Sequence, residues 1–302
     1  MKSLVLLCLA IIFLTLSQCK NNIVNIEKST GYNFKSPDES IELPSVLHEI
    51  SGLTYIDSIN FACIQDENGI LFIYDFRDRK IAREFKFFSK GDYEGIARVD
   101  DTIYVLRSDG VLFEIADYKS DSIIVIPYQT NIPSKDNEGL CYDSENRRLL
   151  IACKENTGKG ELSKDKRYIF AFNLDSMYLV PDPVFSFDIE KLKEFAKINK
   201  VKLPLKGKAK GLSVESVLKL QASEIAIHPL SKKIYILSAE DYMLFVFDKT
   251  GKIEQMVMLN HTLFNQPEGI TFLENGDMLI SNEGPGKGPA TLLRFNYHAV
   301  RN

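Results

Sequence analysis

The chain has 302 residues, of which 45% are hydrophobic and 26% charged, so it can bury a sizeable core and lacks the composition of a disordered protein. Its 37 basic and 41 acidic residues give a formal net charge of -4, which excludes a strong overall attraction to nucleic acid. We therefore predict a globular protein with no nucleic-acid partner.

The first 19 residues are typical of a bacterial lipoprotein signal. A basic start is followed by residues 4–16 without a charge, a run too short for a membrane-spanning helix of roughly 20 residues. Leu16-Ser17-Gln18-Cys19 resembles a lipobox, although Gln18 stands where a small residue is usual. We predict a signal peptide over residues 1–18, lipidation of Cys19 and a tether over residues 19–38. This places the protein on the bacterial cell envelope as a lipid-anchored membrane protein, periplasmic or at the cell surface. The alternative is an uncleaved anchor with an incidental cysteine.

A short phrase recurs along the mature chain, and it decides the predicted fold. Its three positions hold a small or acidic residue, then usually glycine, then an aliphatic residue. The five copies are Ser51-Gly52-Leu53, Glu94-Gly95-Ile96, Glu138-Gly139-Leu140, Ser223-Glu224-Ile225 and Glu268-Gly269-Ile270. Their first residues are separated by 43, 44, 85 and 45 positions.

Each copy opens a similar set of short apolar runs separated by polar turns. In the first repeat the runs cover residues 51–56, 60–65, 70–76 and 80–87, and Asn68-Gly69 can supply the positive φ of a hairpin turn. Four short antiparallel strands in a unit of 40-odd residues predict an all-β fold, a β-propeller.

We predict five blades over residues 39–302, with a six-bladed ring as the alternative. The long interval could hide a sixth blade, but residues 188–210 look like a helical, lysine-rich insertion rather than three strands. The last blade has three strands of its own, and residues 40–44 precede the first blade without belonging to it. The N-terminal strand is therefore expected to complete the last blade and remove open sheet edges.

Because the inner strand of every blade starts on the same face, the first residues of the five phrases should surround one end of the central channel. Glu94, Glu138 and Glu268 would meet there, with Ser51 and Ser223 at the other two positions. Like charges in a narrow channel repel, and a bound cation relieves the repulsion. The available ligands are oxygens, which favours Ca²⁺ over zinc. The alternative is that each glutamate accepts backbone N–H groups of the next blade and only locks the ring.

Three further side chains are candidates for the same end of the channel: Asn137, Asn282 and His48. Among the histidines, His48 could reach the channel end, whereas His228-Pro229 is more typical of a strand end than of a catalytic base. We assign no catalytic residue. Cys63, Cys141 and Cys153 lie in apolar runs and are expected to be buried without a structural disulfide, although a Cys141–Cys153 bridge would be compatible with neighbouring strands.

Residues 191–210 contain eight lysines and one glutamate. Their partial helical spacing favours a solvated helix packed on the edge of the ring. The functional alternative is contact with anionic lipid headgroups or phosphorylated sugars.

The phrases ISGLTY, DYEGIAR, DNEGLCYD, SEIAIHP and QPEGITFLENGDMLISNEG together resemble the SdiA-regulated, YjiK-like family, which is distantly similar to NHL-repeat proteins. The resemblance covers about residues 40–297. It implies a five-bladed propeller with a calcium site, carried over by position to Glu94, Glu138 and Glu268, and it brings no established activity. Glu224 departs from the pattern because it stands where the other copies have glycine.

Two functions are compatible with these features. The first is a lipid-anchored, calcium-binding module that recognises a small-molecule or protein ligand outside the cytoplasm. The second, by analogy of fold, is a calcium-dependent hydrolase of an ester, lactone or phosphoester.

Overall fold

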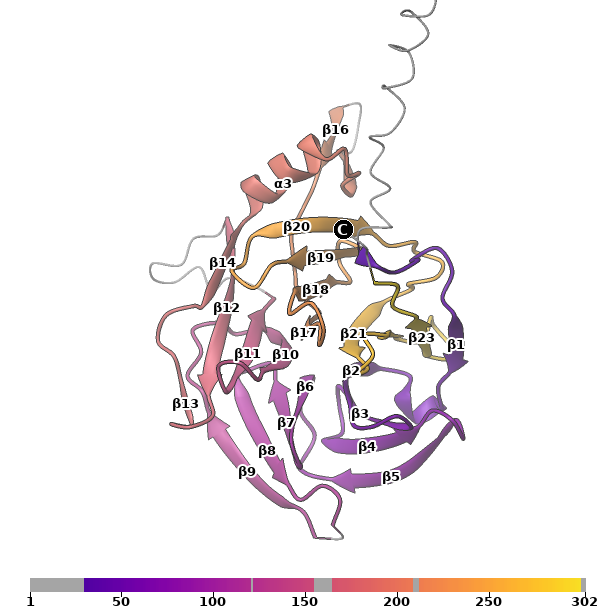
Figure 1. Ribbon diagram of the computed structural model, residues 1–302, viewed down its shortest axis with the longest axis vertical. Coiled ribbons are helices and arrows are strands. Elements are labelled where there is room, and N and C mark those ends of the chain that lie inside the picture. The colour runs from indigo at the N-terminus through magenta and orange to yellow at the C-terminus, as the bar shows by residue number, and fades with distance from the viewer. Residues whose placement is uncertain (1–29, 121, 155–164, 209–211, 300–302) are drawn as a thin grey trace, which may run out of the picture.

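The computed structural model describes residues 30–120, 122–154, 165–208 and 212–299. Five antiparallel sheets stand around a central channel (Figure 1). In four of them the strands run outwards in chain order, and in the fifth the outermost strand is the N-terminal β1. The prediction of a five-bladed propeller is confirmed. The six-bladed alternative is wrong, because the long interval between the third and fourth repeats holds the insertion described below.

The strands of blade 1 match the runs predicted for the first repeat to within one residue. Blade 1 is β2 (Ile50–Tyr55), β3 (Asn60–Gln65), β4 (Ile70–Asp75) and β5 (Lys80–Lys86). Blade 2 is β6 (Tyr93–Val99), β7 (Thr102–Arg107), β8 (Val111–Ala116) and β9 (Ile124–Gln129). Blade 3 is β10 (Asn137–Asp143), β11 (Arg148–Cys153), β12 (Lys166–Asn173), β13 (Tyr178–Leu179) and β14 (Phe185–Asp188). Blade 4 is β17 (Glu224–Ile227), β18 (Ile234–Ser238), β19 (Met243–Phe247) and β20 (Ile253–Met258). Blade 5 is β21 (Pro267–Phe272), β22 (Met278–Asn282), β23 (Thr291–Phe295) and β1 (Glu39–Glu42).

The ring is closed by β1, which comes from the opposite end of the chain to the rest of blade 5. It pairs antiparallel with β23 in a register that sets Glu39 opposite Arg294. A short 3-10 helix, Ser45–Leu47, then leads into blade 1. The predicted closure by the N-terminal strand is confirmed. Because β1 pairs with the outer side of β23, that side of the sheet is not left open.

The insertion leaves blade 3 at β14 and contains α3 (Ile189–Ile198) and a hairpin of β15 (Leu205–Lys208) and β16 (Leu212–Ser216). Asp188 caps α3, because its carboxylate accepts the backbone N–H groups of Glu190 and Lys191 at 3.0 and 3.2 Å. Leu192 and Ala196 are buried on one face. The helix therefore packs on the edge of the ring, as its apolar spacing predicts.

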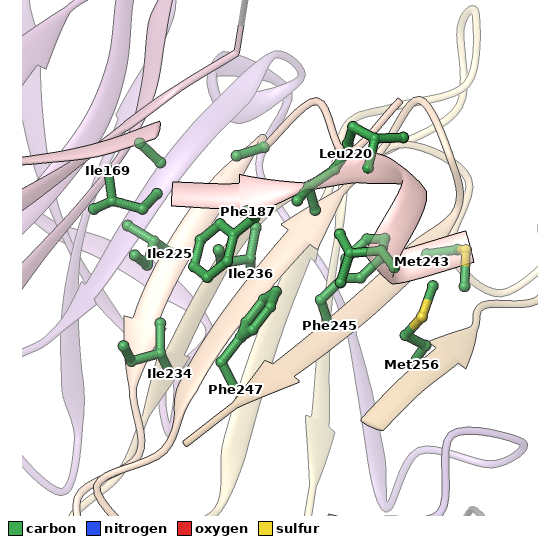
Figure 2. Packing of buried hydrophobic residues seen from close by; sticks show 14 of the residues in the cluster. Ile169, Phe187, Leu220, Ile225, Ile234, Ile236, Met243, Phe245, Phe247 and Met256 are labelled. Atoms are coloured by element: carbon green, nitrogen blue, oxygen red, sulfur yellow. The ribbon is translucent and has the colours of Figure 1, made fainter. Parts of the chain in front are cut away.

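Apolar side chains fill the interfaces between successive blades. The largest cluster joins blade 3, α3 and blade 4 (Figure 2). There Phe187 stacks on Phe247 with ring centroids 4.0 Å apart, and Phe245 is fully buried beside them. Each blade thus depends on its neighbours for burial, as expected for a repeat fold.

The described part of the chain before β1 is also packed. Tyr32 and Phe34 are buried in the cluster between blades 4 and 5, and the Tyr32 hydroxyl donates to the Gly276 carbonyl at 2.5 Å. The packed domain therefore starts before residue 39. The predicted signal peptide, Cys19 and most of the tether lie outside the described residues. Within those residues, we find no helix with both the length and the apolarity needed to span a bilayer.

Candidate functional site

Four inner strands carry a β-bulge at the first residue of the recurring phrase. The register shifts at Ser51 in β2, Glu94 in β6, Glu138 in β10 and Glu268 in β21. A bulge leaves one residue out of the ladder and re-aims its side chain. The bulge explains why a polar residue can stand at the start of a buried strand: its side chain turns towards the end of the channel at which the inner strands begin. We call this end the mouth.

The glycine after each bulge is required by the crowding of neighbouring inner strands. A Cβ atom at Gly95 would lie 2.5 Å from the carbonyl oxygen of Glu138, and one at Gly139 would lie 2.8 Å from the amide nitrogen of Ile225. Such distances are shorter than side-chain carbons tolerate, so glycine is needed for the close approach.

The two serines of the phrase join adjacent blades. The Ser51 hydroxyl donates to the carbonyl of Tyr93 in blade 2 at 2.7 Å, and the Ser223 hydroxyl donates to the carbonyl of Pro267 in blade 5 at 2.9 Å. Both are buried. These two serines therefore lock neighbouring blades together, which is the role considered above as the alternative for the glutamates.

Asn137, Asn282 and His48 also have partners within the protein. The Asn137 amide donates to the Ser108 carbonyl at 2.8 Å, and the Asn282 amide donates to the Thr291 hydroxyl at 3.1 Å. The Nε2 atom of His48 lies 3.0 Å from the Gly286 carbonyl, in the glycine-rich loop. These side chains therefore support loops beside the channel, and Asn137 and Asn282 are buried.

The three glutamates, Glu94, Glu138 and Glu268, act on one another electrostatically. Burial and repulsion from Glu138 raise the pKa of Glu94 to about 9. Burial and repulsion from Glu268, opposed by the nearby Lys154, raise the pKa of Glu138 to about 8. Burial, together with neighbouring carboxylates that include Glu94, raises the pKa of Glu268 to about 8. Blades 2, 3 and 5 thus bring three mutually repelling carboxyls to one mouth, and we call them the mouth glutamates.

The sequence reasoning missed Lys154, which follows β11 and forms an ion pair with Glu138. The Lys154 ammonium is part-buried, and the Glu138 carboxylate outweighs the effect of burial and raises the pKa of this lysine. Lys154 therefore supplies one positive charge among the mouth glutamates.

A second set of acids at the mouth follows the second strands of the blades. An antiparallel second strand ends beside the start of the first, so Asp66 after β3 and Glu283 after β22 occupy the position that Lys154 occupies in blade 3. Burial and nearby carboxylates raise the pKa of Asp66 to about 6 and that of Glu283 to about 7. Aligning the ends of the second strands, as well as the starts of the first, would have pointed to all three residues.

A cavity of about 290 Å³ opens beside two of the mouth glutamates. Glu138, Glu268 and Lys154 line one part of it, and Tyr242 and Glu240 line another. A separate cavity of about 310 Å³ lies at the far end of the channel, between the last residues of the inner strands. The mouth glutamates therefore lie at one end of the channel only. The cavity beside Glu138 and Glu268 is the one whose lining could bind a positively charged ligand.

His228 lies at the far end, after β17, and not at the mouth. It is fully buried, and its Nδ1 atom accepts the backbone N–H groups of Leu230 and Ser231 at 3.2 and 3.0 Å. Burial lowers its pKa to about 4. A neutral histidine that shapes a turn agrees with the interpretation of His228-Pro229 as a strand end.

The chemistry of the mouth fits a hard cation, because its acidic groups are carboxylates and the amide oxygens of Asn137 and Asn282 are buried without a hydrogen-bond partner among the described residues. The positions of these side chains fit a bound ion less well than their chemistry does. Across residues 30–120, 122–154, 165–208 and 212–299, no three His, Cys, Asp or Glu side chains converge closely enough to hold one metal ion. An ion would therefore have to draw the mouth glutamates together and take the place of Lys154 beside Glu138.

No protein-family model matches the chain, and no curated protein matches it at a significant level. Among solved structures, glutaminyl cyclase from Myxococcus xanthus is similar, with a TM-score of 0.56 and 14% identity over 88% of this chain and 97% of that one. A structure of streptogramin B lyase has a TM-score of 0.49 and 11% identity over 85% of this chain and 97% of that one. At 14% identity the first likeness concerns the fold alone, and it supports the propeller. The resemblance to the SdiA-regulated family stays a prediction.

Proposed function

We propose that this protein is a calcium-binding propeller that acts as a binding module in the cell envelope, held at the membrane by a lipid on Cys19. The observation that carries the proposal is the presence of Glu94, Glu138 and Glu268 at one mouth, where burial first and neighbouring carboxylates second raise their pKa values. Like charges that are partly or fully buried on three different blades destabilise the folded state. A divalent cation would turn that cost into affinity, and oxygen ligands favour calcium.

The test is the thermal stability of the full chain after treatment with EDTA, followed by addition of Ca²⁺ or Mg²⁺. A ligand that binds the folded state at a hundredfold excess over its Kd adds about 2.7 kcal/mol, which raises the Tm of a domain of this size by roughly 5–10 °C. Glu94→Gln and Glu268→Gln should each abolish most of the calcium response. Glu190→Gln, an exposed acid on α3, is the matched control and should keep it. A Tm that is unchanged by millimolar Ca²⁺ would contradict the proposal.

A second candidate function is a calcium-dependent hydrolase, which the cavity at the mouth favours. Because this cavity touches Glu138 and Glu268, a substrate could reach a cation held between them. A panel of ester, lactone and phosphoester substrates, assayed with Ca²⁺ and with EDTA, tests the idea. Turnover that disappears with chelation supports the enzyme, whereas a calcium-dependent Tm without turnover supports the binding module.

The lipid anchor is tested separately, in bacteria that express the full chain. Cys19→Ser should move the protein from the membrane fraction to the soluble extracytoplasmic fraction and prevent incorporation of labelled fatty acid. Cys8→Ser, a change inside the predicted signal, is the matched control and should leave both unchanged. Retention of Cys19→Ser in the membrane would favour the alternative of an uncleaved anchor.

A further inference from the structure

Glu224 is the one member of the recurring phrase that does not follow the rule of the other blades. It stands where blades 1, 2, 3 and 5 have glycine, and the pairing of β17 with β18 shows no bulge at this residue. Its side chain is 1% exposed. Blade 4 therefore places a full carboxyl at the level where the other four inner strands have glycine.

One oxygen of this carboxyl is well bonded. Oε1 accepts the backbone N–H of Leu140 in blade 3 at 2.6 Å and that of Ile225 at 3.0 Å. The first of these bonds crosses from blade 4 to blade 3 and fixes the orientation of the side chain. Glu224 is thus held through Oε1, and its second oxygen lies on the side of Gly52 in blade 1.

The second oxygen, Oε2, is buried and has no hydrogen-bond partner among the described residues. It lies 3.4 Å from the position that a Cβ atom of Gly52 would take, and the carbonyl oxygen of Glu94 lies 3.0 Å from the same point. The charged side chains that act on Glu224 are Glu138 and Glu94. The side-chain methyl of Ile96, 3.1 Å from the same point, is the third group there. The polar and charged groups identified around Oε2 are therefore acceptors or negative charges, and an oxygen in such surroundings needs a positively charged or hydrogen-bearing partner.

We propose that Glu224 is the deepest ligand of the cation site, with its Oε2 atom forming the floor below the mouth glutamates. The inference rests on the proposed function, because it assigns a further ligand to the same calcium site. A single divalent ion can satisfy several acceptors at once, whereas a proton on Oε2 satisfies one. Blade 4 thus contributes its ligand one residue later than blades 2, 3 and 5, and its Ser223 hydroxyl, at the equivalent position, donates to Pro267.

Glu224→Gln separates a ligand from a merely buried acid. The amide keeps an oxygen for the N–H groups of Leu140 and Ile225 and points an NH₂ donor at the surrounding acceptors. The EDTA-treated variant should therefore melt at the same temperature as the unchanged protein or higher. Its Ca²⁺ affinity, measured by isothermal titration calorimetry with CaCl₂, should fall at least tenfold, because an amide group is neutral.

Two further variants keep the test decisive. Glu224→Gly restores the residue that the other four blades have and should also lose Ca²⁺ affinity at least tenfold, even if the glutamine variant fails to fold. Glu190→Gln should titrate like the unchanged protein. Equal Ca²⁺ affinity of the unchanged protein and Glu224→Gln would overturn this inference and leave the proposed function standing. Failure of the unchanged protein to bind Ca²⁺ would overturn both.

Discussion

The interface between blades 3 and 4 and the channel mouth are both formed where blades meet, but they bury different chemistry. At the interface, Phe187, Phe245 and Phe247 lie among aliphatic side chains and α3 (Figure 2). At the mouth, Glu94, Glu138 and Glu268 repel one another, with Lys154 as a positive neighbour. Burial stabilises the first region by roughly 1.5–3 kcal/mol for each large apolar side chain, and it destabilises the charged form of the second.

The difference separates what holds the ring together from what the ring can bind. Apolar clusters at the interfaces, together with the Ser51 and Ser223 hydrogen bonds, suffice to join neighbouring blades. Among the described residues we find no comparable bond from the mouth glutamates to the next blade, which is why we propose a ligand for them rather than a role in closing the ring. Variants of the two regions should therefore behave differently towards stability and towards calcium.

The largest effect is expected at the interface. Phe247→Ala removes a fully buried ring stacked on Phe187, and such a truncation costs about 3–5 kcal/mol. Urea unfolding followed by circular dichroism measures the loss. Ile198→Ala, on the 70% exposed side chain at the end of α3, is the control and should change stability by at most about 0.5 kcal/mol. Comparable losses in the two variants would show that the cluster is not as tightly packed as described.

The next effect is a pH dependence that belongs to the mouth. The unfolded chain releases the protons of Glu94, Glu138 and Glu268 near pH 4.5, but the folded protein keeps them to about pH 8 or 9. Between these values the unfolded state binds fewer protons, so the free energy of unfolding falls as pH rises. Screening should keep the fall from pH 5 to pH 9 in EDTA to about 2 kcal/mol, below the limit of about 1.4 kcal/mol per pH unit per group.

Glu94→Gln should reduce this pH dependence, and Ca²⁺ should reverse it, because the ion binds deprotonated carboxylates. Urea unfolding at pH 5, 7 and 9 in EDTA and in Ca²⁺ provides the comparison. A free energy of unfolding that rises with pH in EDTA would contradict the raised pKa values of the mouth glutamates.

A smaller effect is expected for Lys154→Gln, which removes the charge paired with Glu138. In EDTA the variant should lose about 1 kcal/mol, since the partly exposed lysine is screened by solvent. Its Ca²⁺ affinity should rise several-fold in isothermal titration, because the lysine competes with the ion. Lys119→Gln, which breaks an exposed pair with Asp101, is the matched control and should leave Ca²⁺ affinity unchanged. Weaker Ca²⁺ binding by Lys154→Gln would contradict the exchange of lysine for calcium.

The smallest effect is local to the insertion. Asp188→Ala removes the side chain that caps α3 and should cost about 1 kcal/mol, seen as faster hydrogen exchange across residues 189–198. Asp182→Ala, an exposed acid that caps no helix, is the control and should leave exchange in α3 unchanged. Equal protection of α3 in both variants would mean that packing of Leu192 and Ala196 holds the helix without its cap.

Much of the fold could be predicted because it depends on local and repeated features. The spacing of the five phrases, the period-two runs and the Asn68-Gly69 turn set the number of blades and the strands within about two residues. The unpaired run at residues 40–44 predicted closure by β1. Packing of Tyr32 and Phe34 could not be predicted, because nothing in residues 30–34 shows that a gap between blades 4 and 5 accepts two aromatic rings.

The sequence by itself determined which residues begin the inner strands, and hence that Glu94, Glu138 and Glu268 share one end of the channel. Tertiary structure decided how they are arranged, because bulges, inter-blade hydrogen bonds and charges from other strands act between segments far apart in the chain. Ser51 and Ser223 became bridges between blades, Lys154 entered the mouth from the end of a second strand, and Glu224 accepts the N–H of Leu140 in the adjacent blade. A repeat reveals equivalent positions, but a closed ring places each of them beside a different neighbour, and that neighbour sets its chemistry.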